Sequence, residues 1–306
     1  MGMRVRGAAS LLVAGLLAVC VGASSGAVAG GDRLTAPGIV VSATRRAKVL
    51  NLFELSSRGG LHRLLASKRA QLEPALSPDG TKIAYVETQS VRCGACPWTI
   101  WIMNADGTGR HGLTYPQPYQ RNPTLYDQTP SWSPDGKEIV FSRSTGLDNY
   151  DLYIIPATGG VPRETFVGGV SPAWGPTRIA YIQLETNRPG PVELWTMKPD
   201  GSDPELITTA FVVTPTWSRQ GSLAFLDQPA EAPPTLVVYR GGEGHRYLLP
   251  FANATGVTWS PDGEHLAIVA KASPRGSYDV YTIGADGKGL RRLTSGAGAS
   301  DVSWGK

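Results

Sequence analysis

A short phrase recurs six times along this chain of 306 residues. Its full form, Pro-x-Trp-Ser-Pro-Asp-Gly or a close variant, occupies residues 74–80, 130–136 and 257–263, and weaker copies begin at residues 172, 215 and 302. The spacings between the central residues of successive copies are 56, 42, 43, 42 and 45 residues; these residues are Leu76, Trp132, Trp174, Trp217, Trp259 and Trp304. A repeat of about 40 to 45 residues is typical of β-propellers, in which one repeat forms one blade.

Three short runs rich in β-branched and aromatic residues follow each complete phrase, separated by turn residues. In the second repeat these runs are 82–85, 99–103 and 110–114. Three further runs, 38–41, 49–55 and 61–65, have no phrase before them, and the last phrase has no strands after it. The sequence therefore predicts an all-β fold, a six-bladed β-propeller closed by pairing N-terminal strands with a C-terminal inner strand. Such closure removes exposed strand edges.

Each position of the phrase has a structural interpretation. Proline has no N–H, so it fits a strand with a free edge, which places the phrase on the innermost strand beside the central channel. Alternation along this strand puts small residues on the face opposite the aromatic residues: Ala75, Ser131, Ala173, Thr216, Thr258 and Ser303. We therefore expect the aromatic residues to wedge between neighbouring blades.

The predicted domain organisation is a signal peptide at 1–29, a short linker at 30–37 and the propeller at 38–306. Arg4 and Arg6 precede an apolar run from Ala8 to Ala23, and residues 27–29 form an Ala-Val-Ala cleavage site. The apolar run is shorter than the ~20 residues of a spanning helix, so we expect no transmembrane span in the mature chain. The predicted location is extracytoplasmic, either periplasmic or secreted, and lipidation at Cys20 is the alternative to plain cleavage.

The charge balance argues against a nucleic-acid partner. Without Arg4 and Arg6, 27 basic residues face 25 acidic ones, a net charge of +2 for the mature chain. This excess is too small for a nucleic-acid-binding surface. We expect a monomer whose partner is an envelope or extracellular protein.

Two cysteines remain after the signal, Cys93 and Cys96, in a Cys-Gly-Ala-Cys loop. In an oxidising compartment this pair favours a structural disulfide. A redox pair is the alternative, but such a motif needs a helix start behind the first cysteine, whereas Pro97-Trp98 leads into a predicted strand.

Carboxylates beside the phrase suggest one candidate metal site. The residues three positions before the central residue include Glu73 and Asp301, in neighbouring blades, and Asp127 precedes the next phrase. Three carboxylates near one channel mouth could hold Ca²⁺, and the alternative is a solvated acidic rim. No other cofactor is expected.

Long connections alternate with short turns, so they gather on one face of the predicted ring. That face carries tyrosines and arginines, residue types enriched in binding hot spots. The candidate partner-binding residues are Tyr115, Tyr119, Arg121, Tyr126, Arg143, Tyr150, Arg188 and Arg275. The alternative is that long loops merely tolerate insertions.

The repeated phrase, followed by strands such as Lys82-Ile-Ala-Tyr85 and by Leu113-Thr114, resembles the repeat of TolB-type propellers. The resemblance covers about residues 38 to 306, and therefore the propeller domain only. The eight residues from 30 to 37 are too few for the N-terminal α/β domain that precedes the propeller in TolB. In that family the propeller is a periplasmic platform for protein partners.

Similar repeats precede the hydrolase domain of prolyl oligopeptidase-like enzymes, and six-bladed propeller lactonases and lyases place metal and acid–base groups at the channel. The sequence is interpreted as an exported TolB-like propeller that acts as a non-enzymatic protein-interaction or ligand-binding scaffold in the cell envelope. The alternative is a metal-dependent propeller enzyme of lactonase or lyase type.

Overall fold

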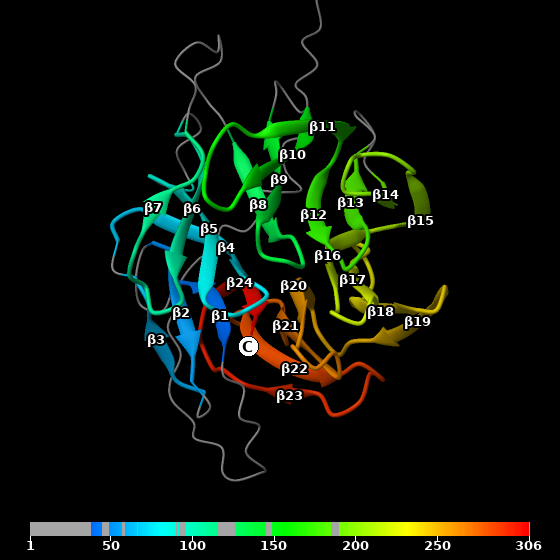
Figure 1. Cartoon of the computed structure of the whole chain (residues 1–306). Helices are drawn as coiled ribbons and strands as arrows, with labels where there is room; N and C mark the ends of the chain where they lie inside the picture. The colour runs from blue at the N-terminus through cyan, green and yellow to red at the C-terminus, as the bar shows by residue number, and fades with distance from the viewer. Residues whose placement is uncertain are drawn as a thin grey trace, which may run out of the picture.

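The computed structural model describes residues 38–44, 49–56, 59–65, 67–89, 91, 96–115, 126–144, 149–184 and 190–305. The predicted signal peptide and linker lie outside these residues. Six four-stranded antiparallel sheets surround a central axis in Figure 1, and the described residues contain no helix. The predicted all-β, six-bladed propeller is confirmed.

Each blade is a meander whose first strand borders the axis. Blade 1 combines β24 (Ala299–Trp304) with β1 (Ile39–Ala43), β2 (Asn51–Leu55) and β3 (Leu61–Arg63). Blade 2 contains β4 (Ala70–Leu76), β5 (Lys82–Thr88), β6 (Thr99–Asn104) and β7 (His111–Gly112). Blade 3 contains β8 (Asp127–Trp132), β9 (Glu138–Ser144), β10 (Tyr150–Pro156) and β11 (Arg163–Gly168).

The second half of the ring repeats this order. Blade 4 contains β12 (Val170–Trp174), β13 (Ile179–Gln183), β14 (Val192–Met197) and β15 (Glu205–Ala210). Blade 5 contains β16 (Val212–Trp217), β17 (Leu223–Asp227), β18 (Thr235–Arg240) and β19 (Glu243–Leu248). Blade 6 contains β20 (Asn253–Trp259), β21 (His265–Lys271), β22 (Asp279–Gly284) and β23 (Arg291–Arg292).

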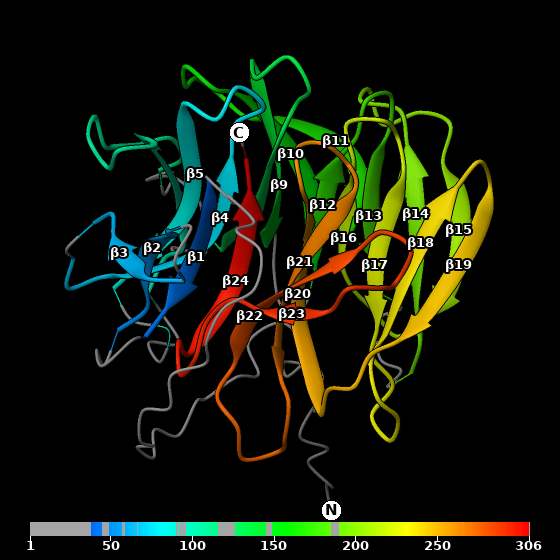
Figure 2. The same cartoon turned by 90° about the horizontal axis from the view of Figure 1, so that it is seen from below.

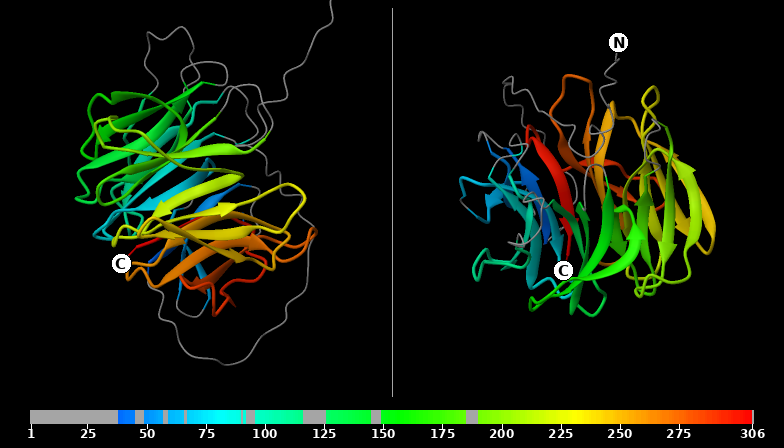
Figure 3. Two further views of the ribbon diagram at one scale, coloured as in Figure 1. Left: turned by 90° about the vertical axis from the view of Figure 1, so that its right-hand side faces the viewer. Right: turned by 90° about the horizontal axis from the view of Figure 1, so that it is seen from above.

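The ring closes where the two ends of the described chain meet. The C-terminal β24 pairs antiparallel with β1, with Ile39 opposite Trp304 and Val41 opposite Val302. Figure 3 shows this red strand beside the blue N-terminal strands. Because backbone hydrogen bonds join the first blade across the break, the predicted composite blade is confirmed.

The hydrophobic core lies between neighbouring blades. Between blades 2 and 3, for example, Ile100 and Ile102 pack with Trp132, Ile139 and Phe141, all of them nearly inaccessible to solvent. The second strands are apolar on both faces because a blade lies on each side of them. The aromatic residues of the phrase occupy these layers, since the Trp132 indole donates from Nε1 to the Ala75 carbonyl of the previous blade at 2.8 Å.

The aspartate of the phrase builds the turn that follows the inner strand. Gly80 N–H donates to Ser77 O at 2.8 Å, and Asp79 Oδ1 accepts from the Ser77 hydroxyl and from Thr81 N–H. Gly80 has a φ of 73°, a value that favours glycine. The Ser77 hydroxyl, followed by the Thr81 donors, lowers the Asp79 pKa to about 2.

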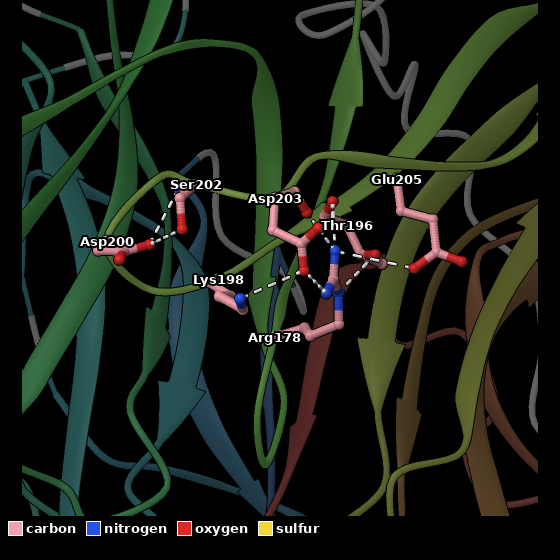
Figure 4. Close-up of polar contacts among 7 residues, drawn as sticks. All are labelled: Arg178, Thr196, Lys198, Asp200, Ser202, Asp203 and Glu205. Carbon is pink, nitrogen blue, oxygen red and sulfur yellow. Dashed lines mark hydrogen bonds and ion pairs between the residues drawn. The ribbon is translucent and has the colours of Figure 1, made fainter.

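The second tight turn of a blade uses the same chemistry. In blade 4, Asp200 Oδ1 accepts from Ser202 N–H at 2.9 Å, and the Arg178 guanidinium pairs with Asp203 at 3.0 Å (Figure 4). Arg178 Nε also donates to Thr196 Oγ1 at 2.9 Å, which ties the turn to the adjacent strand (Figure 4).

Candidate binding site in the central channel

The inner strands enclose a channel of about 3750 Å³. We call the end that carries the Ser-Pro-Asp-Gly and Asp-Gly turns the turn face, and the end that carries the longer connections the loop face. In Figure 2 the end of β24 lies at the top, on the turn face, and the connection after β21 lies at the bottom. Both mouths and the six inner strands contribute to the channel wall.

An arginine crosses the channel at the turn face. Arg219 stands where other copies of the phrase have Pro78, Pro134 and Pro261. Its Nη2 donates to the carbonyl oxygen of Pro78. Blades 5 and 2 are opposite each other in a ring of six, so this contact spans the mouth. The turn-face opening is therefore obstructed by a side chain.

The loop face contains the described members of the predicted partner-binding set. Tyr115 is 62% exposed, and Arg275 is also exposed. Tyr126 and Tyr150 are half-buried, and the Tyr126 ring meets the Trp98 ring edge-on at a centroid distance of 6.2 Å. The rest of the set, apart from Arg143, lies outside the described residues: Tyr119, Arg121 and Arg188.

Arg143 differs from the sequence-based expectation, because its guanidinium is an internal group. Its Nε and Nη2 donate to Asp127 Oδ1 and Oδ2 at 2.7 and 2.9 Å, a bidentate pair in which the Asp127 side chain is fully buried. The guanidinium also lies 5.0 Å from the centroid of the Tyr153 ring. Neither Arg143 nor Asp127 is presented to a ligand, so this pair stabilises blade 3 instead.

Glu73 and Asp301 do meet at the channel wall. Asp301 Oδ2 accepts from the Ser42 hydroxyl at 2.6 Å and from Glu73 N–H at 3.5 Å. Glu73 Oε2 accepts from Thr129 N–H at 2.6 Å. Burial first, and the charge of Asp301 second, raise the pKa of Glu73 to about 8.

The structure does not bring the proposed cation ligands into one cluster. Among the described residues, the group of three metal-compatible side chains that converge is Asp262, Glu264 and His265, which is partly exposed beside a turn. Asp127 is neutralised by Arg143, which leaves two carboxylates at the Glu73 position. The Cys93–Cys96 disulfide stays a prediction, because Cys93 lies outside the described residues, whereas Cys96 is buried.

Sequence reasoning missed Arg219 and the backbone geometry of the inner strands. The signal for Arg219 was the change of Ser-Pro-Asp-Gly to Ser-Arg-Gln-Gly in the fifth blade. The geometry is a bulge in the inner strands of blades 2 to 5, where Glu73, Thr129, Ser171 and Thr214 have φ of 51°, 51°, 52° and 49°. A bulge leaves its extra residue unpaired in the ladder, and the residue types at these four positions give no sign of it.

Comparisons with known proteins point to TolB propellers. No protein-family model matches the chain. The Tol-Pal system protein TolB of Rhizorhabdus wittichii is 38% identical over 82 residues, which are 26% of this chain and 17% of that protein. The crystal structure of TolB from Acinetobacter baumannii superposes with a TM-score of 0.69 at 18% identity, covering 88% of this chain and 67% of that one.

A peptidase also shares the repeat. The uncharacterized peptidase YuxL of Bacillus subtilis is 32% identical over 108 residues, 34% of this chain. The matched segments span 17% and 15% of the TolB and YuxL relatives, so the likeness concerns a part of each of those proteins. The propeller is similar to that of TolB in sequence repeat and in fold. No helix in the described part of the chain is long and apolar enough to cross a membrane.

Proposed function

We propose that this protein is an exported, non-enzymatic scaffold that binds an envelope or extracellular protein through its loop face. The observation that carries the proposal is the difference between the two channel mouths. Arg219 obstructs the turn-face mouth, where short turns leave few variable side chains. The loop face carries the longer connections, which are unrelated in sequence from blade to blade.

The contacts of the loop face support this choice. Tyr115 and Arg275 are exposed there, and these residue types are enriched in binding hot spots. In the short turns of the opposite face, by contrast, polar side chains are engaged by hydrogen bonds within the turn itself, as the bond from the Ser77 hydroxyl to Asp79 shows. The similarity to TolB, a Tol-Pal system protein, supports a partner in the cell envelope.

A pull-down with matched charge reversals tests the choice of face. The purified protein is used as bait in an envelope extract, together with Arg275→Glu on the loop face and Lys137→Glu on the turn face. The Lys137 side chain is 80% exposed, so both variants should fold. We expect Arg275→Glu to lose the captured partner and Lys137→Glu to retain it. Equal recovery by both variants would mean that the loop face is not the binding surface.

Export itself rests on the sequence pattern of residues 1–29. N-terminal sequencing of the protein recovered from its native compartment is expected to begin close to Gly30. A mature chain that begins at a lipidated Cys20 would replace plain secretion with the lipoprotein alternative, and an intact Met1 would contradict export.

A further inference from the structure

Four of the six inner strands have a bulge with the same backbone conformation at the same position beside the channel. Glu73, Thr129, Ser171 and Thr214 occupy this position in blades 2 to 5, each with a positive φ near 50°. The aligned residues of the other two blades, Gly256 and Asp301, are paired in the ladder, because the register shifts there fall at Thr255 and Ser300. All six aligned residues line the channel. Non-glycine residues rarely adopt this conformation, so four aligned cases indicate one shared backbone geometry.

Two of these amides are capped by a carboxylate from the preceding blade. Thr129 N–H donates to Glu73 Oε2 at 2.6 Å. Glu73 N–H in turn points to Asp301 Oδ2 at 3.5 Å. At each of these blade boundaries the chain therefore places a carboxyl oxygen of its own in front of the bulged amide.

The next two amides have the same backbone conformation and no such cap. The preceding blades offer only hydroxyl side chains, those of Thr129 before Ser171 and of Ser171 before Thr214. The Thr129 hydroxyl is already bonded to Ser142 Oγ at 2.8 Å. Among the described residues, no side-chain oxygen accepts a hydrogen bond from the amide of Ser171 or of Thr214.

We propose that the channel wall at Ser171 and Thr214 is a binding subsite for a carboxylate group supplied by a ligand. The donors are backbone N–H groups, which suit an anion and exclude a cation. A backbone N–H group is a hydrogen-bond donor and cannot accept, so its partner must offer an acceptor such as a carboxylate oxygen. The ligand carboxylate would occupy the place that Glu73 and Asp301 occupy at the other two boundaries.

The chemistry allows two sources of the carboxylate, a small organic acid or the chain terminus or acidic side chain of an inserted peptide. Both would enter from the loop face, because Arg219 obstructs the opposite mouth. The subsite does not require the protein partner proposed above, so either proposal can fail without the other.

The test is a titration of ¹⁵N-labelled protein with glutarate, and with glutaramide as the neutral analogue. We expect the amide signals of Ser171 and Thr214 to shift downfield with glutarate alone. A trialanine with a free C-terminus, compared with its C-terminal amide, provides the peptide arm. Saturable shifts with glutarate or with the trialanine acid support the subsite. The acid that causes them shows whether a small organic acid or a peptide supplies the carboxylate. If neither acid shifts these amides, or the neutral analogues shift them equally, the proposal is wrong.

A variant that copies the native cap makes the test specific. Ser171→Glu places at blade 4 the side chain that Glu73 places at blade 2, with the same φ within a degree. Its carboxylate should reach the Thr214 amide, shift that signal without ligand and weaken acid binding about tenfold, since bonds to charged groups are strong. Thr158→Glu adds the same charge to a channel-lining residue on the turn face and should leave binding unchanged.

A second variant covers the case in which Ser171→Glu does not fold. Glu73→Ala removes the cap from Thr129 N–H, so the Thr129 amide should become a third signal that responds to the acids. If Ser171→Glu binds the acids as well as the native protein does, or Glu73→Ala exposes no new responsive amide, the carboxylate assignment is wrong.

Discussion

Two tryptophans at equivalent positions differ in one hydrogen bond, and this difference predicts unequal costs for the same substitution. Trp132 is 6% exposed and donates from Nε1 to Ala75 O at 2.8 Å. Trp217 is half-buried and its Nε1 is inaccessible, yet Nε1 has no hydrogen-bond partner among the described residues. Phenylalanine keeps most of the apolar contact at both positions and removes the N–H.

At position 132, phenylalanine leaves the buried Ala75 carbonyl without its donor. Such a loss costs about 1 to 3 kcal/mol, so we expect Trp132→Phe to lower the free energy of unfolding by about 2 kcal/mol. At position 217 the same change removes an N–H that was buried without a partner, which offsets part of the lost packing. We therefore expect Trp217→Phe to change stability by less than about 1 kcal/mol.

Urea unfolding followed by circular dichroism measures both differences, provided that the slope of the transition is unchanged. Trp259→Phe is a useful third case, since Trp259 Nε1 donates to Thr216 O at a longer 3.2 Å and should give an intermediate loss. If Trp217→Phe is as destabilising as Trp132→Phe, the indole hydrogen bond does not explain the difference between the two tryptophans.

Three further predictions concern the channel, the buried ion pair and the blade interface. The folded-state pKa of Glu73 is about 8 against 4.5, so its contribution to stability is fully present below pH 4.5 and is lost as the pH rises through about 8. The melting temperature of Glu73→Gln should fall less over this range than that of the native protein, whereas the exposed Glu205→Gln should follow the native curve. Asp127→Ala leaves the Arg143 guanidinium buried without its partner and should cost about 3 to 5 kcal/mol in urea unfolding. Asp203→Ala, which breaks the exposed ion pair with Arg178, is the comparison. If Asp127→Ala lowers stability less than Asp203→Ala does, the assignment of Asp127 and Arg143 as a buried pair is wrong. In Gly175→Ala the new Cβ would lie 2.6 Å from the Trp217 ring, so overpacking should cost about 1 to 3 kcal/mol. Gly190→Ala, whose new Cβ would meet no described residue within 4 Å, is the control, and equal melting temperatures for the two variants would mean that the blades are not in tight contact at Gly175.

Much of the fold was predictable because the phrase acts locally. Ser77, Asp79 and Gly80 form hydrogen bonds with one another within a single turn, so the same spacing elsewhere in the sequence predicts the same turn. The strand that precedes the turn must border the axis, since its proline cannot donate to a further strand. Counting the copies therefore counts the blades, and the unmatched strands at the two ends predict the closure through β24 and β1.

The candidate site was only partly predictable. The repeat places Glu73 and Asp301 at equivalent positions of adjacent blades, and the structure shows them in contact. Asp127, just before the next phrase, was expected to join them. Instead it accepts a hydrogen bond from Arg143, which lies sixteen residues later on the neighbouring strand. Side-chain choice between two nearby partners depends on burial and distance, which a repeat pattern does not contain.

The sequence by itself determined the number of blades and the identity of the inner strands, because both follow from short-range hydrogen bonding repeated at a regular interval. It also predicted the closure, because the strands left over at one end match the inner strand left over at the other. The tertiary structure alone decided what the channel presents. The contact of Arg219 with Pro78 joins residues from opposite blades, and the positive φ of Ser171 and Thr214 occurs at bulges set by strand pairing. These features depend on where the ring brings distant segments together in space, and that placement is a property of the closed propeller.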